Sequence, residues 1–336
     1  MSKQKLIDAG FDFQGTVFDK KGSEIHLMDA DTGIPTLVTE SNAGVPVELL
    51  TNFSNTVIEI RTEPRNATKV FSETVVGDWT LEHDKYREEE LNGTVAPYSD
   101  FGNAGVSDIN TNWIANDFYR YQTLIRYGEL EAAKSTAAKF DLIGGKQRSG
   151  ANTLAVFANR SYLYGIQNLQ IFGILNHPMY NPVINSQSVG GNTSWADKGA
   201  MDIYEDIRAA IGSVIDASAG LIDQNSTFKL PIANTLVKYL DKLTEFNTKS
   251  VWSLVRDSYP NAEFITVPEF STDAGDLMYV VADNASGQPT GECVTNMRMK
   301  AFSVIPDTSS FKQKVASGTG GFRLYQSWAV SRLLVA

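Results

Sequence analysis

The chain has 336 residues, of which 42% are hydrophobic and 20% charged, and its formal net charge is −10. This composition is that of an ordinary globular protein with ample material for a core. No run of about 18 apolar residues is present to span a membrane, and the acidic balance argues against a protein whose main task is to grip nucleic acid. The single cysteine, Cys293, fits a chain made in a reducing cytoplasm.

Residues 1–60 are predicted to form an extended N-terminal arm. Up to residue 45 the segment is Gly-rich, and its turn signals, such as Lys20-Lys21-Gly22 and Asn42-Ala43-Gly44, leave room only for short strands. Residues 47–60 have apolar side chains at mixed spacing and fit a short helix followed by a strand. Such an arm needs a neighbouring surface to become ordered.

Residues 61–107 are predicted to form a long two-stranded β-hairpin. The charged sequence LEHDKYREEELNG precedes TVAPYSDFGNAG, and Asn92-Gly93 between them is a turn signal. The strands are too polar to carry a core, and a two-stranded ribbon is marginally stable alone in water, so another chain is expected to hold it. A flexible surface loop is the alternative, and the pattern alone does not separate the two.

The next segment, residues 108–143, has the helical spacing i, i+4, i+7 on one face: Ile114, Phe118, Tyr121, Ile125, Ala132 and Thr136. This spacing predicts one long helix over 111–143, begun by Asn110 or Thr111 and closed by Gly144-Gly145. A second helix is predicted over 148–164, with Gly165 at its end.

Residues 186–299 alternate between helical and strand patterns, which is typical of a compact α/β domain. A capping box of Ser194 and Asp197 predicts a helix over 196–217. Shorter helices are predicted over 235–243 and 251–258, and strands over 228–232, 263–267 and 277–281. The tail from residue 300 is strand-rich, so the chain as a whole is predicted to be α+β.

No set of residues in the sequence predicts catalysis, a metal site or a cofactor site. His26, His83 and His177 lie in separate segments, whereas a zinc site needs two to four Cys/His ligands at short spacing. The glycine-rich stretch 317–321 leads into a strand pattern and not into a phosphate-binding helix. Adjacent carboxylates Glu88, Glu89 and Glu90 point to opposite faces of a strand, which favours a solvated or intersubunit salt-bridging edge over acid–base chemistry.

Several motifs, spread in order from about residue 70 to the C-terminus, resemble one known family. They are VVGDW at 75–79, GTVAPYSDFGNAG at 93–105, IRYGELEAAK at 125–134, YLYGIQNLQIFGILNHP at 162–178, LPIANTLVKYLDKLTEFNTKSVWSLV followed by YPNAEF, and SSFKQKVASGTGGF at 309–322. The chain resembles the major capsid proteins of tailed bacteriophages with the Hong Kong 97-type fold. Two departures are Gly320, where the family often has a bulky residue, and Lys85, which has no identifiable crosslinking partner.

The resemblance implies a domain plan. Residues 1–60 would be the N-terminal arm and 61–107 the extended loop. Residues 108–185, with a spine helix over 111–143, would be the peripheral domain, 186–299 the axial domain, and 300–336 strands that return to the peripheral domain.

The resemblance also implies a function: a major capsid protein, a virion component without enzymatic activity that self-assembles into the icosahedral head enclosing double-stranded DNA. Expected partners are copies of the same chain as hexamers and pentamers, separate scaffolding, decoration and portal proteins, and packaged DNA held by weak non-specific contacts, with no membrane. Assembly is expected in the cytoplasm of the bacterial host.

Two groups of site residues are predicted. The hairpin residues Glu82, Asp84, Lys85, Arg87, Glu88, Glu89 and Glu90 are expected to contact another subunit, and the arm lysines Lys3, Lys5, Lys20 and Lys21 to face DNA. Two alternatives remain. An encapsulin-type nanocompartment shares the fold and encloses cargo enzymes, and an enzyme would need a cleft with convergent polar groups in the α/β domain.

Overall fold

The computed structural model describes residues 16–18, 24–26, 63–100, 102, 105–188, 192–244 and 249–336. The chain divides into two units, residues 1–58 and 59–336. In the first unit, β1 (Thr16–Phe18) and β2 (Glu24–His26) pair in antiparallel fashion. Most of the predicted arm, including Lys3, Lys5, Lys20 and Lys21, lies outside the described residues.

A six-stranded sheet is the centre of the larger hydrophobic core in the second unit. Its strands run in the order β7 (Ile184–Asn185), β16 (Val330–Val335), β11 (Gly275–Ala282), β8 (Phe228–Ile232) and β9 (Ala262–Thr266), and β10 (Ser271–Thr272) pairs with β11. The β8–β9 and β16–β7 pairs are parallel and the others antiparallel. The strands predicted at 228–232, 263–267 and 277–281 are confirmed to within a few residues.

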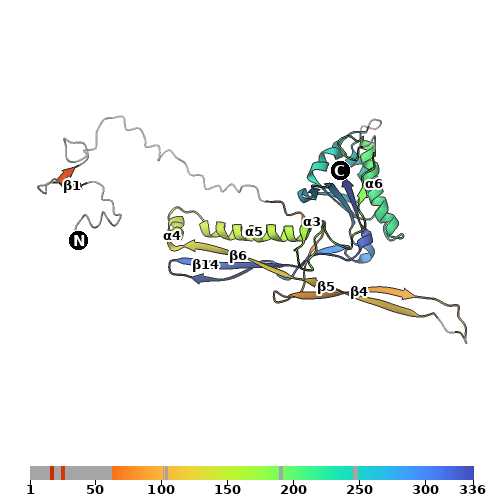
Figure 1. The fold of residues 1–336 in the computed structure, drawn as a ribbon, viewed down its shortest axis with the longest axis horizontal. Coiled ribbons are helices and arrows are strands. Elements are labelled where there is room, and N and C mark those ends of the chain that lie inside the picture. Colours follow the sequence, from red (N-terminus) through yellow and green to blue (C-terminus); the bar gives the residue numbers. More distant parts are fainter. Residues whose placement is uncertain are drawn as a thin grey trace. The chain divides into compact units, whose positions relative to one another are not determined.

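Helix α6 (Ala200–Ala217) packs beside this sheet (Figure 1). Helix α8 (Val251–Ser258) packs against α6, and its Trp252 stacks on Phe264 of β9. The buried face of α6 carries apolar side chains at spacings of three and four: Ile203, Ile207, Ile211 and Val214. The predicted start at 196 was wrong, because Gly199 is the N-cap residue and its N–H donates to the Asp202 carboxylate (3.1 Å). The predicted helix 235–243 is instead α7 (Asn234–Val237) followed by a 3₁₀ turn, η1 (Lys238–Asp241).

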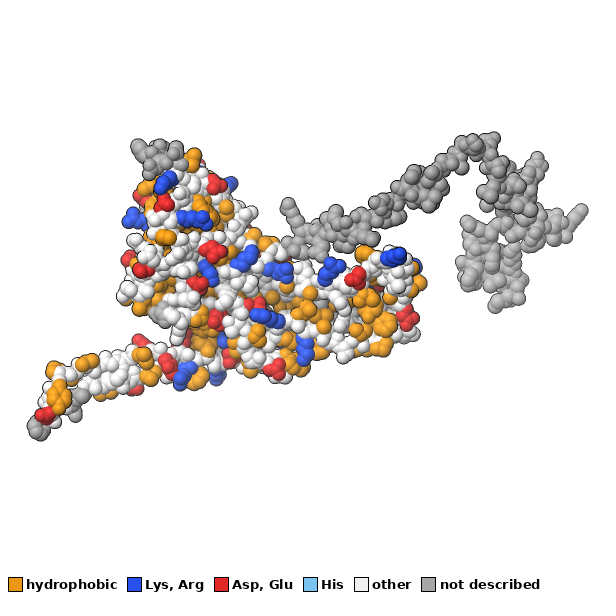
Figure 2. All heavy atoms as spheres, turned by 180° about the vertical axis from the view of Figure 1, so that it is seen from behind, with side chains coloured by type: hydrophobic (Ala, Val, Ile, Leu, Met, Phe, Trp, Pro, Cys, Tyr) orange, Lys and Arg blue, Asp and Glu red, His pale blue; other side chains and the backbone are white. Residues whose placement is uncertain are grey.

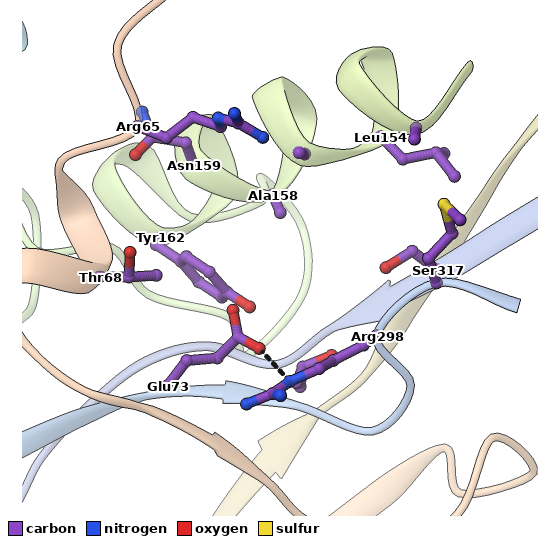
Figure 3. Close-up of a pocket in the computed structure, with 13 residues that line it drawn as sticks. Arg65, Thr68, Glu73, Leu154, Ala158, Asn159, Tyr162, Arg298 and Ser317 are labelled. Atoms are coloured by element: carbon purple, nitrogen blue, oxygen red, sulfur yellow. Dashed lines mark hydrogen bonds and ion pairs between the residues drawn. The ribbon is translucent and has the colours of Figure 1, made fainter. Parts of the chain in front are cut away.

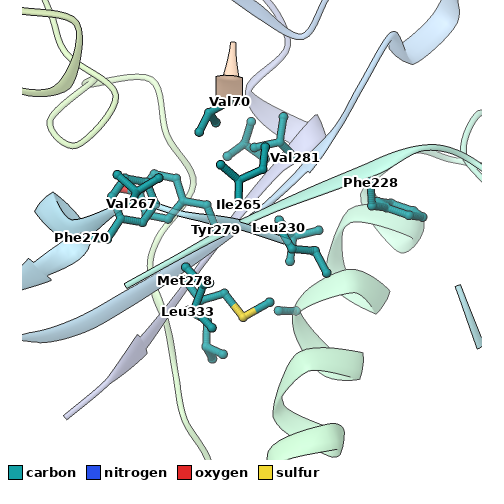
Figure 4. Close-up of a cluster of buried hydrophobic side chains, with 14 of the residues drawn as sticks. Val70, Phe228, Leu230, Ile265, Val267, Phe270, Met278, Tyr279, Val281 and Leu333 are labelled. Atoms are coloured by element: carbon teal, nitrogen blue, oxygen red, sulfur yellow. The ribbon is translucent and has the colours of Figure 1, made fainter. Parts of the chain in front are cut away.

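The side chains around this sheet form a continuous apolar core (Figure 4). Phe228, Phe270 and Tyr279 are fully buried and belong to three different segments of the domain. Burying one such side chain contributes roughly 1.5–3 kcal/mol. The core therefore accounts for much of the stability of the 186–299 region.

A buried ion pair ties α6 to the segment before it. Lys198 Nζ lies 2.7 Å from Asp206 Oδ2, and both side chains are almost completely shielded from solvent. Ser186 Oγ and Trp195 Nε1 donate to the same carboxylate at 2.7 and 3.0 Å. The donors compensate the cost of burying the charge, which is the condition under which such pairs persist.

A second, thinner layer consists of a long helix on a three-stranded sheet (Figure 1). Helix α5 (Leu142–Tyr164) has 23 residues and lies on the sheet β13 (Lys300–Pro306), β14 (Ser310–Thr319) and β6 (Tyr119–Gly128). The core of this layer is small, with Ile125, Leu154 and Val315 buried and Tyr121 packed against them. Asp141 caps α5 by accepting from the Gly144 N–H at 2.9 Å.

The helix predicted over 111–143 was wrong. The segment forms most of β5 (Ser107–Asp117), all of β6, and then α4 (Glu129–Ala137). β6 pairs with β14 over ten residue pairs, from Gly128↔Ser310 to Tyr119↔Thr319. Its β-branched and aromatic residues favour a strand, and the partner that completes the ladder is almost 200 residues away, so the helical spacing in the sequence was misleading.

The long helix is therefore α5, which the sequence predicted only in part, as 148–164. Gly144 and Gly145 lie in its first turn and do not close a preceding helix. Gly165 does end it, with a φ of 69° that favours glycine.

The predicted β-hairpin exists, but with different bounds. β4 (His83–Gly93) and β5 pair over 11 residues each, from His83↔Asp117 to Gly93↔Ser107. Asn92-Gly93 ends the first strand and does not form the turn, and residues 94–106 connect the strands. The second strand had been assigned to the predicted helix.

The C-terminal strands reach three different sheets. β13 and β14 join β6, as predicted for a return to the layer around the long helix. β15 (Gly321–Leu324) pairs with β12 (Gly291–Thr295), which pairs with β3 (Glu73–Val75). β16 belongs to the six-stranded sheet, so the predicted return of all residues 300–336 was wrong for this strand. The remaining short helices are α3 (Ala67–Val70), η2 (Pro268–Phe270), η3 (Ala285–Gly287) and η4 (Ser327–Ala329).

Candidate functional site

The β4–β5 hairpin exposes large apolar side chains, and a group of them is uncommon on the surface of a monomeric protein. Because residues directly opposite in a ladder share a face, Leu91 and Ile109 lie together, and Trp113 follows on the same face. Their exposed fractions are 80%, 51% and 61%. The connection carries Val95, Tyr98 and Val106, which are also exposed, and the narrow ribbon at the lower left of Figure 2 shows hydrophobic side chains near its far end. Patches of this kind mark interaction surfaces.

A buried arginine anchors the root of the hairpin, which is the end where β4 begins and β5 ends. Arg323 of β15 is 4% exposed, and its Nη2 lies 2.8 Å from Asp84 Oδ2 of β4. The guanidinium lies over the rings of Tyr86 (5.2 Å) and Phe118 (5.8 Å). Burial, followed by the Glu88 charge, raises the pKa of Tyr86 to about 12, so this ring remains a neutral phenol. The arrangement fixes a cation between two aromatic faces and a carboxylate.

On this side of the root, the side chains of Asn116 and Phe118 lie close to the backbone of Gly320. Asn116 is buried, and its Nδ2 donates to the Gly320 carbonyl at 3.0 Å. A Cβ at position 320 would lie 2.7 Å from Phe118 Cε1. Gly320, which departs from the family pattern, thus lets Phe118 and Asn116 pack closely against the backbone.

The other side of the root is held by exposed or half-exposed polar groups. Arg120 Nη2 lies 2.6 Å from Glu82 Oε1, and His83 Nδ1 lies 2.7 Å from Asp117 Oδ1. Asp117 also accepts from the Gln170 backbone N–H at 2.9 Å. That backbone hydrogen bond, with a smaller contribution from His83, holds the pKa of Asp117 below its ordinary value.

The seven predicted contact residues divide into two groups. Glu82 and Asp84 are used within the chain, in the pairs with Arg120 and Arg323, which indicates a role in positioning the hairpin. The others lie farther along β4, with the side chains of Lys85, Arg87, Glu89 and Glu90 exposed. Arg87 and Glu89 pair with each other on the same face. Contact of these five residues with another subunit stays a prediction.

Glu88 is a partly shielded carboxylate within this second group. Its Oε1 is removed from solvent and has no hydrogen-bond donor among the described residues. A shielded carboxylate oxygen without a donor is costly. A donor from outside the described part of the chain therefore fits this position.

The charge pattern of residues 82–90 does not reveal the exposed apolar residues of the hairpin. The signal for them was present, because Leu91, Ile109 and Trp113 are large apolar residues within an otherwise polar stretch. Recognising it required the correct strand pairing, which places the first two directly opposite each other.

A groove of about 430 Å³ lies beside α5 (Figure 3). Leu154, Ala158 and Tyr162 of α5 form one wall, and a pair of Glu73 Oε1 and Arg298 Nε, 2.8 Å apart, lies opposite. Burial raises the pKa of Tyr162 above its ordinary value, so the phenol stays protonated. The groove contains no histidine, cysteine or activated nucleophile, and its lining does not form a catalytic set.

Two other groups with reactive side chains, Cys293 and His177, are buried. Cys293 is buried and burial raises the pKa of its thiol, which favours an inert side chain. His177 is buried beside Phe172, Tyr180 and Phe322, and burial lowers its pKa to about 4. No cluster of three or more His, Cys, Asp or Glu suited to a metal ion occurs in the part of the chain that the structure describes.

Among the helices described here, none is both long and apolar enough to cross a bilayer.

The chain is similar in fold to solved structures of capsid and encapsulin shells. The chain matches the capsid of Myoviridae phage XM1 with a TM-score of 0.69 at 11% identity, covering 88% of this chain and 100% of that chain. It matches the capsid of an empty GTA particle with a TM-score of 0.59 at 9% identity, covering 86% and 96%. It also matches the SrpI encapsulin of Synechococcus elongatus PCC 7942, with a TM-score of 0.57 at 11% identity, covering 87% and 95%. No curated protein matches the chain in sequence.

The extended hairpin, the long helix on its sheet and the compact domain together define a Hong Kong 97-type capsid fold. The family model of the Pa193 gp26 major capsid protein matches residues 36–335, and the chain belongs to this family. It is a bacteriophage major capsid protein, a structural subunit of a capsid shell and thus a component of the virion. The predicted α+β capsid fold and the predicted role as a subunit of a capsid shell are both confirmed.

Proposed function

We propose that the β4–β5 hairpin is the principal contact by which one subunit of this shell holds the next. The observation that carries the proposal is the exposed set Leu91, Ile109 and Trp113 on one face of a two-stranded ribbon. A ribbon with 11 residues in each strand and no core of its own gains stability when an apolar face is covered. The shielded Glu88 oxygen without an internal donor supports the same reading.

The domain plan is proposed with bounds adjusted to the observed strands. The extended loop corresponds to residues 83–117, and the peripheral domain to β6, α4, α5, β13 and β14. The axial domain corresponds to the six-stranded sheet with α6 and α8, and includes β16. Residues 1–60 remain the proposed N-terminal arm.

The content of the shell and its partners are proposals as well. The subunits would form hexamers and pentamers of an icosahedral head around double-stranded DNA, in the cytoplasm of a bacterial host, with separate scaffolding, decoration and portal proteins. The net charge of −10 supports only weak, non-specific contact with DNA. Lys3, Lys5, Lys20 and Lys21 stay proposed as DNA-facing residues. The subunit is proposed to have no catalytic activity, since the described residues form no catalytic set.

Electron microscopy and light scattering of the purified full-length protein test the hairpin proposal. The wild type should form closed shells, and the variant Leu91→Ser, Ile109→Ser, Trp113→Ser should remain as small oligomers with unchanged circular dichroism. Replacing exposed apolar residues outside the hairpin, such as Leu221→Ser, is the matched control. Closed shells formed normally by the triple hairpin variant would contradict the proposal.

The encapsulin-like alternative is supported by one similar structure, the SrpI encapsulin. The contents of purified particles distinguish the two. Nuclease-protected DNA supports a phage head, whereas a single co-purifying enzyme would support a cargo compartment.

A further inference from the structure

β6 is an edge strand of its sheet. In the order β13–β14–β6 it pairs with β14 on one side, and the described residues provide no strand to pair with it on the other. A free edge presents backbone N–H and C=O groups that can pair with a strand of another chain, and soluble proteins usually shorten or cover such edges. β6 is ten residues long, so its free edge is large enough to bind a second strand.

The register of the β6–β14 ladder determines which backbone groups face the free side. Gly128 lies opposite Ser310, and the Glu129 N–H donates to the Ser309 carbonyl at 3.1 Å. A bond between these flanking residues shows that the opposed pair itself exchanges no backbone hydrogen bond. The backbone N–H and C=O of Gly128 therefore point away from β14, and so do those of every second residue before it, back to Arg120.

Two contacts at the C-terminal end of β6 agree with this direction. Lys146 Nζ of α5 donates to the Arg126 carbonyl at 3.0 Å. The Gly128 N–H donates to Glu131 Oε2 of α4 at 3.3 Å. Both partners approach from the side away from β14, so backbone groups on this side are accessible to other donors and acceptors.

The free side has a defined beginning and end. The Phe118 N–H donates to the Glu82 carbonyl at 2.8 Å, and because residue 118 is also even-numbered, this places the start of the hairpin on the same side. At the other end, α4 begins directly after residue 128. We name residues 120–128 the open edge, and its midpoint is Leu124.

A groove of about 370 Å³ lies beside the open edge, between β6 and α5. Its wall on α5 includes the small residues Ser149, Gly150 and Thr153, so a neighbouring strand and helix can approach closely. Ile125 packs against α5, and Leu124, one position before it, therefore points to the opposite face of the sheet. The Leu124 side chain is 45% exposed there.

We infer that the open edge pairs with the open edge of a second copy of this chain, as antiparallel strands related by a two-fold axis beside Leu124. The occupant is a second copy because β6 is complementary to itself in this register. Residue 120 of one copy lies opposite residue 128 of the other, so the two free stretches match from end to end. Leu124 meets Leu124 of the second copy, and each exposed apolar side chain covers the other.

The charges and hydrogen bonds of the open edge fit the same register. Arg126 lies opposite Gln122 of the second copy, so no two like charges face each other. The outward N–H and C=O groups at 122, 124 and 126 all find partners across the axis. The Arg126 carbonyl can accept from the Gln122 N–H of the second copy besides Lys146, because a carbonyl oxygen has two lone pairs.

This contact goes beyond the proposed function and does not depend on it. Pairing of two open edges is isologous, with the same surface used by both copies, and joins subunits in pairs. A hairpin that holds a neighbouring subunit uses two different surfaces and is heterologous. The two contacts can therefore be tested separately.

Cysteine crosslinking of closed shells of the full-length protein tests the register. In a hydrogen-bonded antiparallel pair the two Cα atoms are about 5.5 Å apart, within the range that a disulfide bridges. Mild oxidation should convert most subunits of Leu124→Cys into disulfide-linked dimers. Gln122→Cys alone and Arg126→Cys alone should stay monomeric on a non-reducing gel, and the double variant should crosslink. The wild type is a further control, since Cys293 is buried.

Charge substitution at the axis is an independent test. Leu124→Lys alone or Leu124→Glu alone places like charges opposite each other and should raise the protein concentration needed for shell formation by about tenfold or more. An equal mixture of the two variants should recover most of it, because each lysine can then meet a glutamate. Leu221→Lys changes an exposed leucine outside the open edge and should assemble as the wild type does. Circular dichroism of unassembled subunits should be alike for all variants.

Several outcomes overturn the inference. Leu124→Cys shells without dimers, or a mixture of the Lys and Glu variants that assembles no better than either alone, would exclude a two-fold contact at Leu124. Crosslinking of Gln122→Cys alone would show a different register. Slow hydrogen exchange of the 122 and 124 amides in unassembled subunits would show that a segment of the same chain covers the edge. None of these results affects the hairpin proposal, which the Leu91, Ile109, Trp113 variant tests.

Discussion

Arg323 Nη2 and Asp84 Oδ2 are 2.8 Å apart, although β15 and β4 belong to different sheets. This pair links the strand that enters the hairpin to a strand next to the main core, where Phe322 and Leu324 are buried. The orientation of a long ribbon is thereby set by a few residues at its root. Such a root is sensitive to single substitutions.

Arg323→Met should loosen the hairpin without unfolding the domain. The substitution leaves the Asp84 carboxylate, whose side chain is 24% exposed, without its cation. We expect a loss of roughly 2–3 kcal/mol, which is less than the loss of about 3–5 kcal/mol for a fully buried pair. Hydrogen exchange of β4 and β5 amides in the unassembled subunit should accelerate. Arg160→Met removes an exposed pair with Glu63 and is the control, and equal exchange rates in both variants would refute the role of Arg323.

Gly320→Ala should destabilise the subunit by roughly 1–3 kcal/mol, because the new methyl group would lie 2.7 Å from Phe118 Cε1. Gly212→Ala in α6 is the matched control, since nothing lies within 4 Å of the added Cβ. A helical alanine there should stabilise by about 0.5–1 kcal/mol. Urea unfolding of unassembled subunits measures both, and a neutral Gly320→Ala would show that Phe118 moves freely.

His177 should make the subunit less stable in mild acid. Burial lowers its pKa from an ordinary 6.5 to about 4, so the unfolded chain takes up a proton before the folded one does. The stabilisation is complete above pH 6.5 and is lost as the pH falls toward 4, with a loss of about 2 kcal/mol at pH 5.

Urea unfolding at pH 7 and pH 5 measures this loss, and His177→Phe should remove most of it. His83→Gln, which changes an exposed histidine, should retain it. A pH dependence that is the same in wild type and His177→Phe would assign the loss to carboxylates instead.

Lys198→Met should be among the most damaging single changes, because it leaves the Asp206 carboxylate buried without its cation. We expect a loss of about 3–5 kcal/mol. Lys249→Met removes an exposed lysine that pairs with Asp257 and should cost about 0–1 kcal/mol. Thermal unfolding of the two variants compares them directly, and similar midpoints would show that solvent reaches the Lys198 site.

The compact domain was predictable because its signals are local. The strands 228–232 and 277–281 are short apolar runs bounded by turns, and the buried face of α6 repeats at three and four residues. The segment 107–128 was not predictable, because it forms strands that pair with residues 310–319 and 83–93, and these partners are not adjacent to it in the sequence. The spacing of Ile114, Phe118, Tyr121 and Ile125 fits a helix and a pair of strands alike, and only the ladder partner decides between them.

The hairpin that carries the candidate site was predictable from the sequence, but the exposed apolar residues on it were not. Charge placed the contact on residues 82–90, and the structure confirms that these residues begin a hairpin. The buried role of Asp84 follows from Arg323, more than 200 residues away, which no local pattern reveals.

The hydrophobic cluster between α5 and its sheet is small, with Ile125, Leu154 and Val315 as its buried members. Close-packed interiors resist deformation, so a layer with so few interlocked side chains has low mechanical stiffness compared with the six-stranded sheet and its large core. Under outward pressure from packed contents, we expect elastic bending to concentrate in this layer while the compact domain moves as a rigid block. The small core beside α5 would then determine how readily the shell wall bends. The large core around the six-stranded sheet would determine the strength of the wall.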